Sequence, residues 1–100
     1  MKPVIILDVA AQEIEEAIDF YANASQGLDM TFMARITDAL QLIEQFPEAG
    51  TPLDVSPESS TRRVLVKGFP YALFYRVYET ESRVIAFGDT RRQPRPWRNR

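Results

Sequence analysis

The side chains of this sequence that could do chemistry are mostly cations, and most of them lie in its second half. Residues 61–100 hold 10 lysines and arginines and three acids, which gives this segment a net charge of +7. Residues 1–60 hold 11 acids and two bases, a net charge of −9. This division predicts that the second half contacts an acidic partner, either a protein or a nucleic acid. The alternative is that the two halves neutralise each other within the fold.

The missing residue types limit the reactions that the chain could catalyse. The sequence contains no histidine and no cysteine. It therefore has no thiol nucleophile, no disulfide, no Ser-His-Asp or Cys-His catalytic group and no histidine-based metal site. Tyr71, Tyr75 and Tyr78 are poor bases at an ordinary pKa of about 10, and arginines stabilise negative charge but do not shuttle protons well. We expect no metal and no cofactor.

The length and composition predict one soluble domain that spans residues 1–100. The chain is 45% hydrophobic and 26% charged, which is ordinary for a globular protein. No apolar run approaches the roughly 20 residues of a membrane span, and the apolar part of the N-terminus is too short for a signal peptide. We therefore expect a cytoplasmic protein with no membrane partner.

The first half of the chain predicts a short strand followed by two helices. Residues 4–7 form a β-branched run typical of a strand, and Asp8 is the expected N-cap of a helix that ends at residues 25–27. A second helix, predicted over residues 28–46, is stopped by Pro47. Because the connection is short, the helices should form an antiparallel hairpin. The apolar positions that recur at the helical period are Ala10, Ile14, Ala17, Ile18 and Tyr21 in the first helix, and Phe32, Met33, Ile36, Ala39, Leu40, Ile43 and Phe46 in the second.

The second half predicts a loop and three strands. Residues 47–61 are rich in proline, glycine and serine, which is typical of a loop. Strands are expected over residues 62–67, 71–78 and 83–88, with turns short enough for an antiparallel meander. The helix hairpin is the only available cover for so apolar a sheet. The predicted fold is therefore α+β, with an N-terminal strand and an antiparallel helix hairpin packed on an antiparallel sheet in the order β-α-α-β-β-β. The tail, residues 91–97, is expected to be extended.

These elements and motifs together resemble the RelE/ParE toxin superfamily of bacterial type II toxin–antitoxin modules, often called plasmid stabilisation proteins. The resemblance covers nearly the whole chain. Each motif is weak alone, but their order and their spacing in a chain of this length are specific. The motifs are Ala11-x-x-Ile14-x-x-Ala17-Ile18-x-x-Tyr21, Ala39-Leu40-x-x-Ile43-x-x-Phe46-Pro47-x-x-Gly50, Arg62-Arg63-Val64-Leu65-Val66-Lys67-x-Phe69-Pro70-Tyr71-x-Leu73-x-Tyr75-Arg76-Val77, Val84-Ile85-Ala86 and Arg91-Arg92-x-Pro94-x-x-Trp97.

The resemblance implies a toxin that is neutralised by a cognate antitoxin protein. Members of one branch, RelE-like, cleave mRNA on the ribosome, and members of the other, ParE-like, bind DNA gyrase. Fold alone does not choose between these branches. The resemblance also implies that any contact with promoter DNA is made only through the antitoxin.

Three positions depart from the ribonuclease branch. Ala72 stands where that branch has an arginine, Asp89 where related members have a histidine, and Pro96 where many have a tyrosine. We therefore favour a ParE-like toxin that acts on gyrase by protein–protein contact and is not an enzyme. The alternatives are a RelE-like mRNA endoribonuclease, which would contact the ribosome, and a non-toxic module that only binds the antitoxin.

Individual residues carry competing interpretations. If the chain cleaves RNA, Arg63, Lys67 and Arg91 are the candidate catalytic cations. Asp89 is expected to hold Arg91 or the loop backbone, although it could instead be a base. Partner contacts are predicted for Arg62, Arg63, Arg76, Arg91, Arg92 and Trp97.

Each predicted partner contact also has a structural alternative. Arg62 and Arg63 could be solvated charges of a strand, and Trp97 could pack the tail onto the body of the protein. For Arg76 we favour the structural interpretation, in which it pairs with an N-terminal acid such as Asp8 or Asp19.

Overall fold

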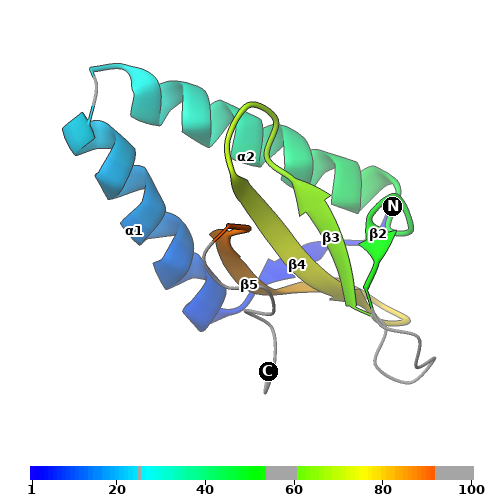
Figure 1. The fold of residues 1–100 in the computed structure, drawn as a ribbon. Helices are drawn as coiled ribbons and strands as arrows, with labels where there is room; N and C mark the ends of the chain where they lie inside the picture. Colours follow the sequence, from blue (N-terminus) through cyan, green and yellow to red (C-terminus); the bar gives the residue numbers. More distant parts are fainter. Residues whose placement is uncertain (25, 54–60, 92–100) are drawn as a thin grey trace.

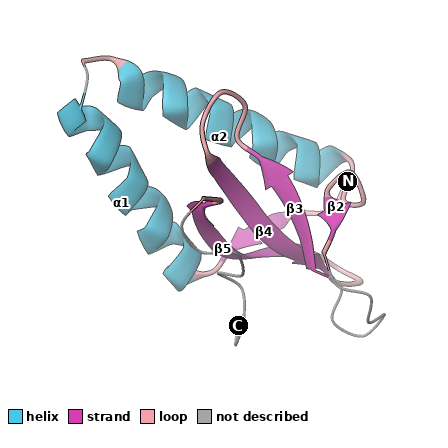
Figure 2. Ribbon diagram, viewed as in Figure 1, coloured by secondary structure: helices cyan, strands magenta, loops and turns pink. Residues whose placement is uncertain are grey.

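The computed structural model describes residues 1–24, 26–53 and 61–91. Figure 1 shows two helices that diverge from a short turn and cover one side of a β-sheet. The helices are α1 (Asp8–Ala24) and α2 (Leu28–Gln45), and the strands are β1 (Val4–Ile6), β2 (Thr51–Pro52), β3 (Thr61–Leu65), β4 (Tyr71–Val77) and β5 (Ser82–Asp89). The predicted α+β class and the helix hairpin are confirmed (Figure 2).

The sheet has more strands than the sequence predicts. Its order is β1-β5-β4-β3-β2, and β3, β4 and β5 form the predicted antiparallel meander. The N-terminal strand β1 joins this meander parallel to β5. The prediction that residues 47–61 form only a loop is wrong at β2, which pairs antiparallel with β3. A strand of two residues is too short to produce a periodic pattern, so the sequence could not reveal it.

The main core lies between the helices and the sheet. Phe32, Ile36 and Ile43 of α2 are buried as predicted, and they pack with the helix-facing side chains of β3, β4 and β5. The predicted core residues Ile14, Ile18 and Leu40 are partly buried against the same cluster.

The predicted burial of the helix stripe is wrong at two positions. Met33 and Phe46 are 47% and 61% exposed, respectively. Met33 lies beside the buried stripe rather than on it, and Phe46 follows the last residue of α2. A period of 3.6 residues places a side chain on a helix face but does not show how wide the covered part of that face is.

The ends of the helices differ slightly from prediction. Asp8 is the first residue of α1 rather than its N-cap, and the carbonyl of Leu7 accepts from the Ala11 N–H at 2.9 Å. Gly27 has a φ of 82°, which is the left-handed turn expected between the helices. Neither helix is long and apolar enough to cross a membrane, among the residues that the structure describes.

Candidate partner-binding site

Arg62 and Arg63 point to opposite faces of β3, because successive side chains of a strand alternate. Arg62 is opposite Tyr75 and shares the helix-facing side of the sheet. Its Nη1 donates to the carbonyls of Glu48 and Gly50, at 2.9 and 2.8 Å. These bonds hold the turn that follows α2, so the geometry gives Arg62 a structural role in the free chain.

Arg63 lies on the face of the sheet away from the helices, which we call the far face. It is opposite Phe74, which packs on that face with Ala72, Ile85 and Ala86. Arg63 is partly exposed, and it takes part in none of the ion pairs between the residues that the structure describes. Among the described residues, no acid therefore neutralises its charge.

Arg76 also lies on the far face, where it is opposite Thr61 on one side and Arg83 on the other. Its Nε donates to the Thr61 hydroxyl at 3.1 Å. The favoured prediction that Arg76 pairs with Asp8 or Asp19 is wrong, because the register of β4 points Arg76 away from α1. Of the two arginines that face each other across this ladder, Arg83 is paired with Glu81, whereas Arg76 takes part in none of the ion pairs between the described residues.

Arg83 is a residue that the sequence analysis did not single out. Its Nε donates to a Glu81 carboxylate oxygen at 2.6 Å, and its guanidinium lies 4.4 Å from the centre of the Tyr78 ring. The hydrogen bond and charge of Glu81 raise the pKa of Arg83 above its usual value. Its position opposite Arg76 depends on the strand register, so no local motif could have predicted it.

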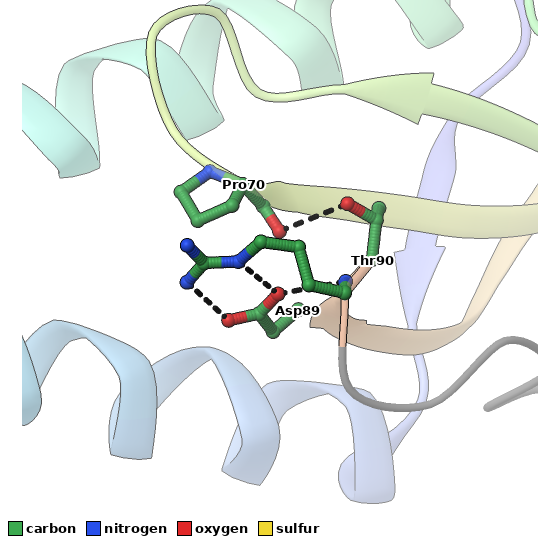
Figure 3. Close-up of polar contacts among 4 residues, drawn as sticks. Pro70, Asp89 and Thr90 are labelled. Atoms are coloured by element: carbon green, nitrogen blue, oxygen red, sulfur yellow. Dashed lines mark hydrogen bonds and ion pairs between the residues drawn. The ribbon is translucent and has the colours of Figure 1, made fainter.

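Asp89 holds Arg91 through its backbone and its side chain, as the sequence analysis expected (Figure 3). Asp89 is 9% exposed. One of its carboxylate oxygens accepts from the Arg91 backbone N–H at 2.9 Å and from Nε at 3.1 Å, and the other accepts from Nη2 at 2.9 Å. This hydrogen-bonded ion pair raises the pKa of Arg91 above its usual value. The Thr90 N–H also donates to the Pro70 carbonyl at 2.8 Å, which ties this turn to β4.

Arg91 and Asp89 line a pocket of about 320 Å³ between α1 and the end of β5. The pocket walls include the rings of Phe20, Tyr21 and Tyr71 and the carboxylates of Glu13 and Glu16. Tyr71 stacks on Phe87 with ring centres 5.2 Å apart, so its ring is held as part of the core.

The structure does not gather the candidate catalytic cations into one site. Arg63 is on the far face, whereas Arg91 is on the α1 side of β5. Lys67 is exposed in the connection between β3 and β4. The Tyr75 side chain is fully buried, and this burial raises its pKa above the usual value, so its hydroxyl is a poorer base than in water.

Two predicted partner residues fall outside the described part of the chain. These are Arg92 and Trp97. Of the other predicted positions, the geometry leaves Arg63, Arg76 and the exposed guanidinium of Arg91 as cations that a partner could reach.

Comparison with known proteins identifies the family. A search among curated proteins gives no match. A solved structure described as the chromosomal ParDE TA system from P. aeruginosa contains a chain with the same fold, with a TM-score of 0.71 and 16% identity over 89% of this chain and 96% of that chain. The family model for the ParE toxin of the type II toxin–antitoxin system parDE matches residues 4–94. The chain therefore belongs to the ParE toxin family of type II toxin–antitoxin systems.

Proposed function

We propose that this protein is a toxin that binds DNA gyrase in the cytoplasm, acts without chemistry of its own, and is neutralised by a cognate antitoxin. The family places it in a toxin–antitoxin module. We infer the gyrase target because the chain resembles the ParE-like branch, and the state of its side chains speaks against the ribonuclease alternative. The observation that carries this proposal is the Asp89–Arg91 pair.

The Asp89–Arg91 pair occupies the one carboxylate that the sequence analysis considered as a base. Cleavage of RNA through its 2′-hydroxyl needs a base, an acid and cations for the phosphorane charge. Asp89 stands where related ribonucleases have a histidine, and its carboxylate accepts three hydrogen bonds from Arg91. Both carboxylate oxygens of Asp89 are therefore engaged by Arg91, so neither is placed to accept a proton from RNA. The other candidate catalytic residues, Arg63 and Lys67, supply positive charge and do not lie together with Arg91, which supports binding rather than catalysis.

The same cations favour neutralisation by an acidic segment of the antitoxin. Arg63 and Arg76 share the far face, and Arg76 and Arg83 face each other across β4 and β5. Carboxylates of a partner could pair with Arg63 and Arg76 and would be steered by the basic half of the chain. We therefore propose the far face around Arg63 and Arg76 as a surface that the antitoxin covers, and the exposed guanidinium of Arg91, on the α1 side of β5, as a separate contact.

Two assays on the purified toxin test the target. Supercoiling by DNA gyrase should be inhibited in proportion to toxin concentration, and addition of the antitoxin from the neighbouring reading frame should restore it. Toeprinting on programmed ribosomes should show no new cuts in the ribosomal A site.

The variants Arg63→Ala and Arg91→Ala separate the alternatives. Ribosomal cuts that disappear in either variant would replace this proposal with an mRNA endoribonuclease. No effect in either assay, together with tight binding of the antitoxin, would leave a non-toxic module that only binds the antitoxin. Induced expression without the antitoxin, with DNA replication and translation followed separately, provides the cellular control.

A further inference from the structure

The pocket between α1 and the end of β5 is built by two regular elements. On the helix side its lining residues recur at helical spacing and so share one face of α1: Glu13, Glu16, Ala17 and Phe20. Asp89 lies on the opposite wall, on the side of β5 that faces α1 (Figure 3). Ala17 is 6% exposed, and its small side chain leaves room between the helix and the sheet. The shape of the pocket is therefore fixed by the packing of α1 on the sheet.

Aromatic rings form the apolar part of the wall. Tyr71 stacks on Phe87, and Tyr21 lies edge-on to Tyr71 with ring centres 6.0 Å apart. These three rings pack in the main core and are held in place by it. Phe20 is 56% exposed beside them, with its ring centre 5.2 Å from that of Tyr21. An exposed phenylalanine at the rim of a ring-lined pocket favours a ligand with a flat, apolar surface.

The charged groups of the pocket favour a cation. The lining contains the carboxylates of Glu13, Glu16 and Asp89 and the guanidinium of Arg91. Asp89 and Arg91 neutralise each other in their ion pair, which leaves the two glutamates in excess. The Phe87 N–H donates to Glu13 Oε1 at 3.3 Å and so orients this carboxylate at the pocket. Carboxylates beside aromatic rings bind a cationic group by ion pairing and by cation–π contact.

Glu16 is the carboxylate that a ligand can reach most easily. Its side chain is exposed, and it takes part in none of the ion pairs between the residues that the structure describes. The Gln12 amide donates to Glu16 Oε1 at 3.3 Å, but this partner is neutral. Phe20 follows Glu16 by four residues, so the charge and the exposed ring lie side by side on α1.

We propose that this pocket receives an arginine side chain of the protein that the toxin inhibits. The guanidinium pairs with Glu16, and its flat face lies against the rings of Phe20 and Tyr21. Arginine fits better than lysine, because a guanidinium is flat, stacks on aromatic rings and binds a carboxylate through two parallel hydrogen bonds. The volume of about 320 Å³ is at the low end for ligand sites, which agrees with one long side chain.

The charge of the pocket also indicates which partner supplies the arginine. This inference rests on the proposed function, in which the target is DNA gyrase and the antitoxin contributes carboxylates to Arg63 and Arg76. Glu13 and Glu16 would repel such an acidic segment, so it does not enter the pocket. The target acts on DNA, and surfaces that hold DNA present arginines to its phosphates. An antitoxin contact at the Arg91 guanidinium would cover the rim of the pocket and so compete with the target.

A titration followed by NMR tests the pocket without either protein partner. The probe is N-acetyl-arginine amide, and its match is N-acetyl-citrulline amide, which has the same shape but no charge. The arginine probe should cause saturable shifts at the Phe20 and Gly88 amides at about millimolar concentration, and the citrulline probe should bind at least about fivefold more weakly. Adenosine monophosphate is titrated in parallel, because a nucleobase could also stack on the rings.

Two variants separate the charge from the ring. Glu16→Gln keeps the size of the side chain and removes its charge, so the arginine probe should bind about fivefold or more weakly. Glu15→Gln is the matched control, since Glu15 is exposed, makes the same change in net charge and does not line the pocket, and its affinity should stay within about twofold. Phe20→Ala should weaken binding about as much as Glu16→Gln. Glu16 and Phe20 are both exposed, so neither change removes a buried contact.

Inhibition of DNA gyrase by the full chain tests the partner. The toxin concentration that halves supercoiling should rise about tenfold or more in Glu16→Gln and in Phe20→Ala. It should stay within about twofold of the wild-type value in Glu15→Gln.

The outcomes separate this inference from the proposed function. No saturable shifts with the arginine probe, equal binding of the citrulline probe, or tighter binding of adenosine monophosphate would each overturn the arginine site. Binding of the arginine probe together with unchanged inhibition in both variants would overturn the assignment of the arginine to the target. A wild-type toxin that leaves gyrase active would overturn the proposed function and this target together, whereas the titration still decides whether the pocket binds arginine.

Discussion

The hydroxyl of Tyr75 on β4 joins the turn after α2 to the centre of the sheet. It accepts from the Gly50 N–H at 2.9 Å and donates to the Pro47 carbonyl at 2.7 Å. The contact is so close that a Cβ atom on Gly50 would lie 2.5 Å from this hydroxyl oxygen. Arg62 binds the Gly50 carbonyl from the other side. The spacing of Pro47, Gly50, Arg62 and Tyr75 in the sequence thus reflects one hydrogen-bonded cluster.

Tyr75→Phe should lower the free energy of unfolding by about 1–3 kcal/mol, because the Gly50 N–H and the Pro47 carbonyl lose a buried partner. Gly50→Ala should cost a similar amount through overpacking against the Tyr75 ring. The double variant should be less destabilised than the sum of the two, since both changes act on one contact. Urea denaturation of the four proteins measures this coupling, and strictly additive losses would contradict it.

The Tyr75 cluster should also make the protein sensitive to alkaline pH. Burial raises the pKa of Tyr75 above its value of about 10 in the unfolded chain. The unfolded state therefore loses this proton first as the pH rises, so the stability is complete below about pH 10 and declines as the pH passes through the folded pKa. Denaturation between pH 8 and 11 should show a smaller alkaline decline in Tyr75→Phe than in the wild type. Parallel declines would assign the effect to other groups.

Ile36→Ala should destabilise the protein by about 2–5 kcal/mol. Ile36 is 4% exposed in the core between α2 and the sheet, where its removal leaves a cavity. The control is Leu42→Ala on the same helix. Because Leu42 is 40% exposed, this substitution should lower the free energy of unfolding much less. Equal losses at the two positions, measured by urea denaturation, would argue against the described packing of α2.

Charge reversal on the far face should weaken the antitoxin complex and flatten its dependence on salt. Arg62 and Arg63 are both among the partner contacts predicted from the sequence, but Arg62 holds the turn after α2 and its loss would also affect folding. Arg63→Glu is therefore the sharper test. Arg35→Glu is the control, since Arg35 pairs with Asp38 on α2. Calorimetric titration at two salt concentrations checks the prediction, and an unchanged affinity in Arg63→Glu would reject this surface.

The secondary structure could largely be predicted because its signals are local. The helix stripes place Phe32, Ile36 and Ile43 in the core, and the change to a period of two after residue 61 predicts the three strands of the meander. The same local information fails where a strand is very short, and where neighbouring elements determine whether a side chain is buried. It therefore misses β2 and predicts burial for the exposed Met33 and Phe46.

The chain by itself also determines which chemistry is available, because composition does not depend on folding. The absence of histidine and cysteine, and the division into an acidic and a basic half, are properties of the amino-acid sequence alone. They point to binding rather than to proton transfer.

Only the tertiary structure decides which cationic side chains a partner can contact. It turns Arg62 inward to the turn after α2 and Arg63 outward, places Arg76 opposite Arg83, and pairs Asp89 with Arg91. It also places β1 parallel to β5 and so leaves Val4 and Ile6 at an open edge. Most of these relationships join residues that are far apart in the chain. They depend on strand register, in which a shift of one residue reverses every side chain, and no local pattern in the sequence records that register.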